Sequence, residues 1–169
     1  KDALDRMIVC DDIIANYDRH WRNFGLVRNV NSLVCRPAPI FDSGSSLWCN
    51  ISLEELQTGE HSFTSAQFHS SPAKQMLLVE DMSWFDGDKL EGFVDEAIEI
   101  LSKNDALAAR LSYLKEALTW RLERMIDIAE WSLRGSTAPP TPLPATQGLE
   151  LGQGIGAQAA AQSHLDLRS

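Results

Sequence analysis

Apolar residues recur at helical spacing through the second half of the chain, and this pattern constrains the fold more than any other feature. It predicts one long helix that begins near Asn104 and ends near Gly135, because glycine readily adopts the left-handed conformation that closes a helix. A shorter run with the same spacing predicts a preceding helix over residues 90–101, with Asp86 or Asp88 as its N-cap. The two would form an antiparallel helical pair. The apolar positions of the longer helix are Leu107, Leu111, Leu114, Leu118, Leu122, Met125, Ile126 and Ala129.

The first third of the chain predicts a helix followed by a β-hairpin. Residues 1–17 carry an apolar stripe at helical spacing, although Asp11 interrupts it. The runs FGLVRN and SLVCRPAPIF, joined by the turn-forming sequence NVNS, predict two antiparallel strands. Residues 43–75 lack a sustained period and predict a long loop with one short helix near residues 53–56. The expected fold class is therefore α+β and mainly helical.

Composition limits the domain count and the classes of partner. The chain has 169 residues, 44% of them hydrophobic, which suits one domain; we place it at residues 1–134. Residues 135–169 are rich in Pro, Gly, Ala and Gln without an apolar period, and we predict a disordered tail there. A net charge of −9 disfavours direct binding to nucleic acid or to an anionic membrane, since both require clustered Lys and Arg.

Cysteine usage and the N-terminal sequence predict a cytoplasmic protein. The three cysteines form no C-x-x-C pair, so free thiols in a reducing compartment are expected. No run approaches the roughly 18 apolar residues of a membrane span, and the first residues lack the layout of a signal peptide. The sequence starts with Lys1 rather than Met, which is compatible with a fragment of a longer protein.

Polar residues typical of phosphoryl transfer lie between the predicted first helix and the hairpin. Asp18 and Asn23 are five residues apart in YDRHWRNF, and Asp42 lies at the end of the second predicted strand. A hairpin would return Asp42 to the side of Asn23. Amide and carboxylate oxygens suit Mg²⁺, which otherwise keeps water and substrate phosphates as ligands. A second carboxylate, that of Asp18, would orient the attacking hydroxyl group.

The segments YDRHWRNF and APIFDSGSS resemble the catalytic loop and the metal-binding segment of HipA-like bacterial serine/threonine kinases. These kinases share the D-R-H-x-x-N pattern with phosphatidylinositol 3- and 4-kinases. The resemblance implies a protein-kinase-like C-lobe over residues 1–134, with Asp18 as the catalytic aspartate and Asn23 as a Mg²⁺ ligand. It gives Asp42 the role of the aspartate of Asp-Phe-Gly, although this chain reads Phe-Asp-Ser. His20 would orient the phosphate or the catalytic aspartate.

The resemblance further implies ATP as co-substrate, Mg²⁺ as cofactor, a Ser or Thr of a protein as acceptor, and an antitoxin as a possible partner. Phosphoryl transfer also requires a glycine-rich loop, a strand lysine and its glutamate partner, and the sequence shows none of them. We therefore expect a nucleotide-binding N-lobe from a longer parent or from a partner chain.

Other interpretations of the same residues remain open. Asp18, Asn23 and Asp42 could cap turns, and His20 could serve as a structural pin of its loop. The chain could be a non-catalytic interaction module derived from a kinase lobe. A lipid kinase shares the loop pattern, but the sequence lacks a basic membrane-facing patch.

Overall fold

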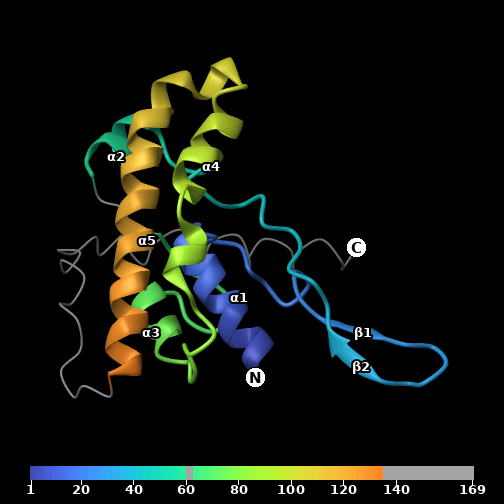
Figure 1. Ribbon diagram of the computed structural model, residues 1–169. Coiled ribbons are helices and arrows are strands. Elements are labelled where there is room, and N and C mark those ends of the chain that lie inside the picture. The colour runs from blue at the N-terminus through green and yellow to red at the C-terminus, as the bar shows by residue number, and fades with distance from the viewer. Residues whose placement is uncertain (60–62, 135–169) are drawn as a thin grey trace, which may run out of the picture.

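The computed structural model describes residues 1–59 and 63–134, and it is mainly helical over these ranges (Figure 1). The predicted disordered tail at residues 135–169 lies outside them. Described elements are α1 (Asp2–Ile13), β1 (Leu26–Arg28), β2 (Cys35–Pro37), α2 (Leu53–Gln57), α3 (Pro72–Met76), η1 (Gly87–Leu90), α4 (Phe93–Leu101), η2 (Asp105–Arg110) and α5 (Leu111–Leu133), where η marks a 3-10 helix.

The predicted hairpin and the predicted helical pair are both present. β1 pairs antiparallel with β2, with Leu26 opposite Pro37 and Arg28 opposite Cys35. Helices α4 and α5 run side by side in opposite directions, and the hairpin projects away from them as a separate arm (Figure 1). The mainly helical α+β composition is thus the one that the sequence predicts.

The starts of both long helices differ from the prediction. Gly92, with a φ of 78°, is the N-cap of α4, so residues 87–90 form a separate 3-10 turn. Asp86 is the N-cap residue of that turn but makes no side-chain capping bond, and the prediction that Asp86 or Asp88 caps the helix over residues 90–101 was wrong, since neither caps α4. Asn104 does cap a helix, by accepting a hydrogen bond from the backbone N–H of Ala106. That helix is the 3-10 helix η2, and α5 begins only at Leu111.

The described residues of the segment 43–75, which exclude 60–62, contain one more helix than predicted. Helix α2 lies where the sequence places it and begins with a capping box between Ser52 and Glu55. Helix α3 was missed because five residues are too few to show a period. Pro72 at its first turn was the available signal, since proline is favoured there.

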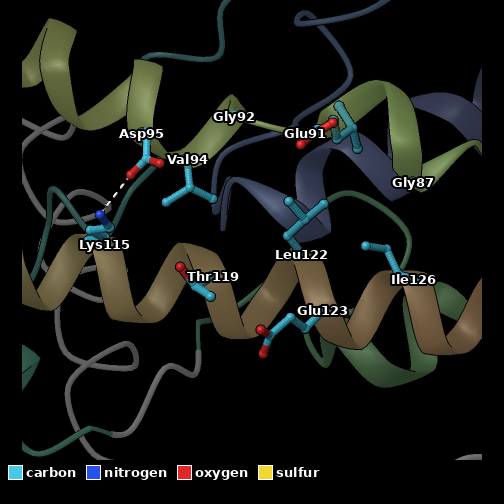
Figure 2. Close-up of a pocket in the computed structure, with 11 residues that line it drawn as sticks. Gly87, Glu91, Gly92, Val94, Asp95, Lys115, Thr119, Leu122, Glu123 and Ile126 are labelled. Carbon is cyan, nitrogen blue, oxygen red and sulfur yellow. Dashed lines mark ion pairs between the residues drawn. The ribbon is translucent and has the colours of Figure 1, made fainter.

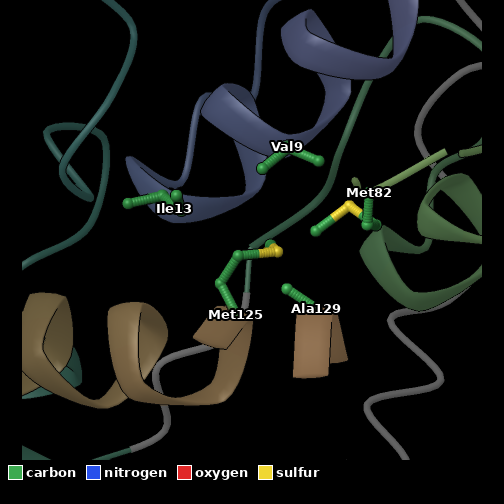
Figure 3. Close-up of a cluster of buried hydrophobic side chains, with 5 residues drawn as sticks. All are labelled: Val9, Ile13, Met82, Met125 and Ala129. Carbon is green, nitrogen blue, oxygen red and sulfur yellow. The ribbon is translucent and has the colours of Figure 1, made fainter. Parts of the chain in front are cut away.

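The core forms where α1 packs against α5. Figure 3 shows Val9 and Ile13 of α1 facing Met125 and Ala129 of α5, with Met82 closing the cluster. A second buried cluster surrounds Trp48. Burial of these side chains fixes the C-terminal end of α1, from which the candidate site extends.

A buried ion pair also joins these two helices. Arg121 of α5 donates a hydrogen bond of 2.7 Å to the carbonyl oxygen of Asp12, and its Nη1 lies 3.2 Å from Oδ2 of that residue. Arg124 approaches the same carboxylate at 2.9 Å. Burial lowers the pKa of Arg121 to about 10, a shift that the Asp12 charge opposes. The guanidinium therefore stays charged at neutral pH and holds α1 to α5.

Cys10, Cys35 and Cys49 are free, as predicted, and they are exposed. Across residues 1–59 and 63–134, no helix combines the length and the apolar character that a membrane span requires.

We expect Gly87→Ala to lower the free energy of unfolding by about 1–3 kcal/mol, because the added methyl group would clash with the side chain of Ile126. A Cβ at this position would lie 2.8 Å from Cγ1 of Ile126, which is closer than two non-bonded carbon atoms normally approach. Urea unfolding measures the loss. Gly25→Ala is the matched control, since a Cβ there meets nothing within 4 Å. Equal stability of the two variants would contradict the close contact.

Candidate functional site

The loop that carries Asp18 is attached to the end of α1 by a buried amide. Asn16 donates a hydrogen bond of 2.9 Å from Nδ2 to Oδ1 of Asp11, a residue of α1. Its own Oδ1 accepts the backbone N–H of Asp18 at 3.1 Å. Ala15 has a φ of 52°, which turns the chain away from the helix axis. The position of Asp18 is therefore set by α1.

Arg19 is the central side chain of this region. It is completely buried, and its Nε and Nη2 atoms each donate a hydrogen bond of 2.8 Å to the carboxylate of Asp11. Two parallel bonds of this kind are the strong geometry for an arginine and a carboxylate. The bonds to Asp11 raise the pKa of Arg19 above its ordinary value, so the guanidinium is permanently charged. The bonds to Arg19 thus explain why a charged residue, Asp11, interrupts the apolar stripe of the helix.

The same guanidinium joins two segments that are far apart in sequence. Nη1 donates to the carbonyl oxygen of Asn23 at 2.9 Å and also to that of Phe41. Nη2 donates to Oγ of Ser43 at 2.8 Å. Asp42 lies between Phe41 and Ser43, so the structure brings the segments of Asn23 and Asp42 to one arginine.

The hairpin leads the chain from the segment of Asn23 back to the segment of Asp42, although its strands end earlier than predicted. Pairing continues beyond the strands, since the backbone N–H of Ala38 donates to the carbonyl of Gly25 at 2.9 Å. Strand β2 stops at Pro37, so placing Asp42 at the end of the strand was wrong. Pro37 and Pro39 lack the N–H groups that a longer ladder needs. Asp42 is placed by the contacts of its neighbours with Arg19 rather than by strand pairing.

Asn23 is held in one orientation. Its side chain is buried, and Nδ2 donates a hydrogen bond of 2.8 Å to the carbonyl oxygen of Asp18. Among the described residues, Oδ1 of Asn23 accepts no hydrogen bond. The amide therefore links the two ends of the D-R-H-x-x-N segment and keeps an oxygen atom for another ligand.

Asp42 is exposed and has an unusual backbone conformation. Its φ is 55°, a left-handed value that aspartate and asparagine tolerate better than most residues. The charge of Asp42 contributes to the raised pKa of Arg19, after the larger effect of Asp11. Phe41 and Ser43, the neighbours of Asp42 in the chain, both bind Arg19, so Asp42 lies beside the buried guanidinium.

His20 has a local role in the loop. The side chain is exposed, and its Nδ1 accepts the backbone N–H of Arg22 at 3.2 Å. The histidine thus stabilises the turn that leads to Asn23, which matches the interpretation as a structural pin. Its role in orienting a phosphate or Asp18 stays a prediction.

These oxygen donors fit Mg²⁺ in number and in kind. Where the structure is described, there is no group of three or more His, Cys, Asp or Glu that could hold a metal ion. Mg²⁺ does not need such a group, because it binds one or two protein oxygens and retains waters and substrate phosphates. Oδ1 of Asn23 and the carboxylate of Asp42 are the two candidates.

Sequence reasoning missed the residues that assemble the site. Asp11 was read as an interruption and Ser43 as part of a loop, whereas both bind Arg19. Trp21, within the same loop, is 64% exposed and contacts Phe24 and Phe68 at ring distances of 5.5 and 5.6 Å. An aromatic surface therefore lies beside the Asp18 loop. The signal for Asp11 was its charge on an otherwise apolar helix side.

Comparison with known proteins gives one short similarity. A stretch of 42 residues, which is 25% of this chain, is 48% identical to a protein named serine/threonine-protein kinase CtkA from Helicobacter pylori strain J99. The matched stretch spans only 13% of that protein's own length. No family model matches the chain, and no solved structure matches it. A short part of this chain is therefore similar to a bacterial serine/threonine kinase.

Proposed function

We propose that this chain carries the catalytic lobe of a HipA-type serine/threonine protein kinase that uses ATP and Mg²⁺. The observation that carries the proposal is the buried Arg19, which binds the segments of both Asn23 and Asp42 and rests on Asp11. The short similarity to a bacterial serine/threonine kinase supports the same reaction class. A protein substrate, an antitoxin-type partner and a cytoplasmic location belong to this proposal.

In the proposed mechanism, each residue of the loop has a separate task. Asp18 accepts a hydrogen bond from the Ser or Thr hydroxyl of the substrate, orients its oxygen toward the γ-phosphate and receives its proton. Oδ1 of Asn23 and the carboxylate of Asp42 would hold Mg²⁺, which when bound neutralises charge on the phosphates. The hydrogen bond from Asn23 to the carbonyl oxygen of Asp18 fixes the position of the catalytic aspartate relative to the metal-binding amide.

The nucleotide-binding site must be completed by residues from another lobe. The described residues contain a single sheet, the two-stranded hairpin, which supplies no lysine. In kinases a strand lysine and a glycine-rich loop hold the phosphates. We propose that a longer parent protein or a partner chain supplies both groups.

A second candidate function is a non-catalytic interaction module. The exposed arm favours it, because five apolar side chains of residues 26–34 are at least half exposed. Soluble monomers rarely present such an apolar surface without a partner. In this case Arg19 and Asn23 would be retained for folding alone.

Titrating Mn²⁺ with ATP into the isotope-labelled chain distinguishes the two candidates. Mn²⁺ replaces Mg²⁺ at oxygen sites and broadens the NMR signals of nearby nuclei. We expect selective, saturable broadening of the Asn23 side-chain amide and of the backbone amides at positions 42–44. Asp42→Asn should weaken the effect, and the matched change Asp88→Asn at an exposed position should not. Because the chain alone lacks the groups that hold the phosphates, the titration is repeated in a protein that joins it to a nucleotide-binding lobe, and no saturable broadening there at millimolar ATP would favour the interaction module.

A further inference from the structure

A groove between α4 and α5 is unfilled in the described structure. It has a volume of about 310 Å³, and Leu90, Val94, Leu122 and Ile126 form its apolar lining, called the floor below. Figure 2 shows the last three of these side chains. The proposed phosphoryl transfer uses none of these side chains. An apolar floor of this size can receive one or two aliphatic side chains of a partner.

The rim of this groove is acidic. Glu91 and Glu123 are exposed at its edge and form no ion pair with any described residue. Lys115 is the one cation in the lining, and it is paired with Asp95 at 2.7 Å, as the dashed line in Figure 2 shows. The lining therefore has a net charge of about −2 and favours a partner with two cationic groups.

The hairpin arm, residues 24–41, has the opposite character. It contains Arg28 and Arg36 and no acidic residue. Its apolar side chains face solvent, with Leu26 71%, Val30 80% and Leu33 63% exposed. Residues 25–37 of this arm are all exposed in the described structure, and they are apolar near the tip and cationic along the strands.

The arm cannot fill the groove of its own chain. In Figure 1 the hairpin extends away from the helical body, and its tip is well separated from the α4–α5 pair. The two surfaces are complementary in charge and in apolar character, but only a second molecule can bring them together.

We propose that the arm of one copy of this chain docks into the α4–α5 groove of another copy. Val30 and Leu33 would enter the apolar floor, and Arg28 and Arg36 would pair with Glu91 and Glu123. The contact joins two different surfaces and is therefore heterologous, so it closes into a ring or extends as a filament according to its rotation. The proposal stands independently of the kinase assignment.

Analytical ultracentrifugation of the full chain and of charge-reversed variants tests this contact. We expect concentration-dependent association of the wild-type chain. Glu91→Lys with Glu123→Lys should raise the dissociation constant by about tenfold or more, and so should Arg28→Glu with Arg36→Glu. Mixing the two double variants should restore association, because the reversed groove then meets a reversed arm.

Matched controls separate this local pairing from a general effect of net charge. Glu99→Lys with Glu116→Lys changes the net charge by the same amount on exposed sites of α4 and α5 outside the groove. Lys74→Glu with Lys103→Glu matches the arm variant in the same way. We expect both controls to associate like the wild type, with circular dichroism verifying that every variant is folded. A wild-type chain that stays monomeric at its highest soluble concentration overturns the proposal, as does association that the mixed variants fail to restore.

Discussion

Asp42→Asn is expected to reduce phosphoryl transfer by about 10³-fold or more in a protein that joins this chain to a nucleotide-binding lobe. Asparagine keeps one oxygen atom and nearly the same shape, but it lacks the negative charge that attracts Mg²⁺ in the proposed mechanism. It also tolerates the left-handed φ of 55° at this position, so the backbone should not change. Transfer of labelled phosphate from ATP to a protein substrate, or to the protein itself, measures the loss.

Two further measurements make the Asp42 result specific to metal binding. Asp88→Asn removes an exposed carboxylate of η1 and should leave the rate unchanged. The apparent affinity for Mg²⁺ should fall in Asp42→Asn and not in the control. Full activity of Asp42→Asn would refute the assignment of this residue as a metal ligand, whatever the outcome for self-association.

Arg19→Met is expected to lower the free energy of unfolding by about 3–5 kcal/mol, because it leaves the buried carboxylate of Asp11 without its cation. The side chain is 0% exposed, so solvent does not screen the loss. Methionine retains much of the length of the arginine stem but none of its five donors. Urea unfolding of the chain measures the difference.

A double variant identifies the buried charge as the cause. Adding Asp11→Asn to Arg19→Met removes the unpaired carboxylate, so the double variant should be more stable than Arg19→Met alone. Arg22→Met changes an exposed arginine of the same loop and should have an effect within about 0.5 kcal/mol. If Arg19→Met unfolds at the same midpoint urea concentration as the wild type, the central role of this arginine is contradicted.

Local pattern was sufficient for the larger elements. The apolar period identified α1, α4 and α5, and the turn sequence NVNS between two short apolar runs identified the hairpin. These elements follow from spacing along the chain, because each buries one side whatever its partner is. The start of α4 was not predictable in this way, since the positive φ of Gly92 divides the helical run.

The residues of the candidate site were visible in the sequence, whereas their assembly was not. The motif with Asp18 and Asn23 occupies six consecutive positions and can be read directly. Asp42 was expected near Asn23 because of the hairpin, but the strands stop at Pro37 and the contact depends on Arg19. Asp11 was read only as an interruption of the apolar stripe, so its bond to Arg19 was not predicted.

The sequence alone determined the three longest helices apart from their exact ends, the hairpin and the polar loop, since these depend on residues that are near one another in the chain. Only the tertiary structure decided that Arg19 would meet Asp11, eight residues away, and Ser43, 24 residues away. A buried guanidinium must satisfy all its donors at once, and the oxygens able to do so are known only after the helix, the loop and the return of the hairpin have packed together.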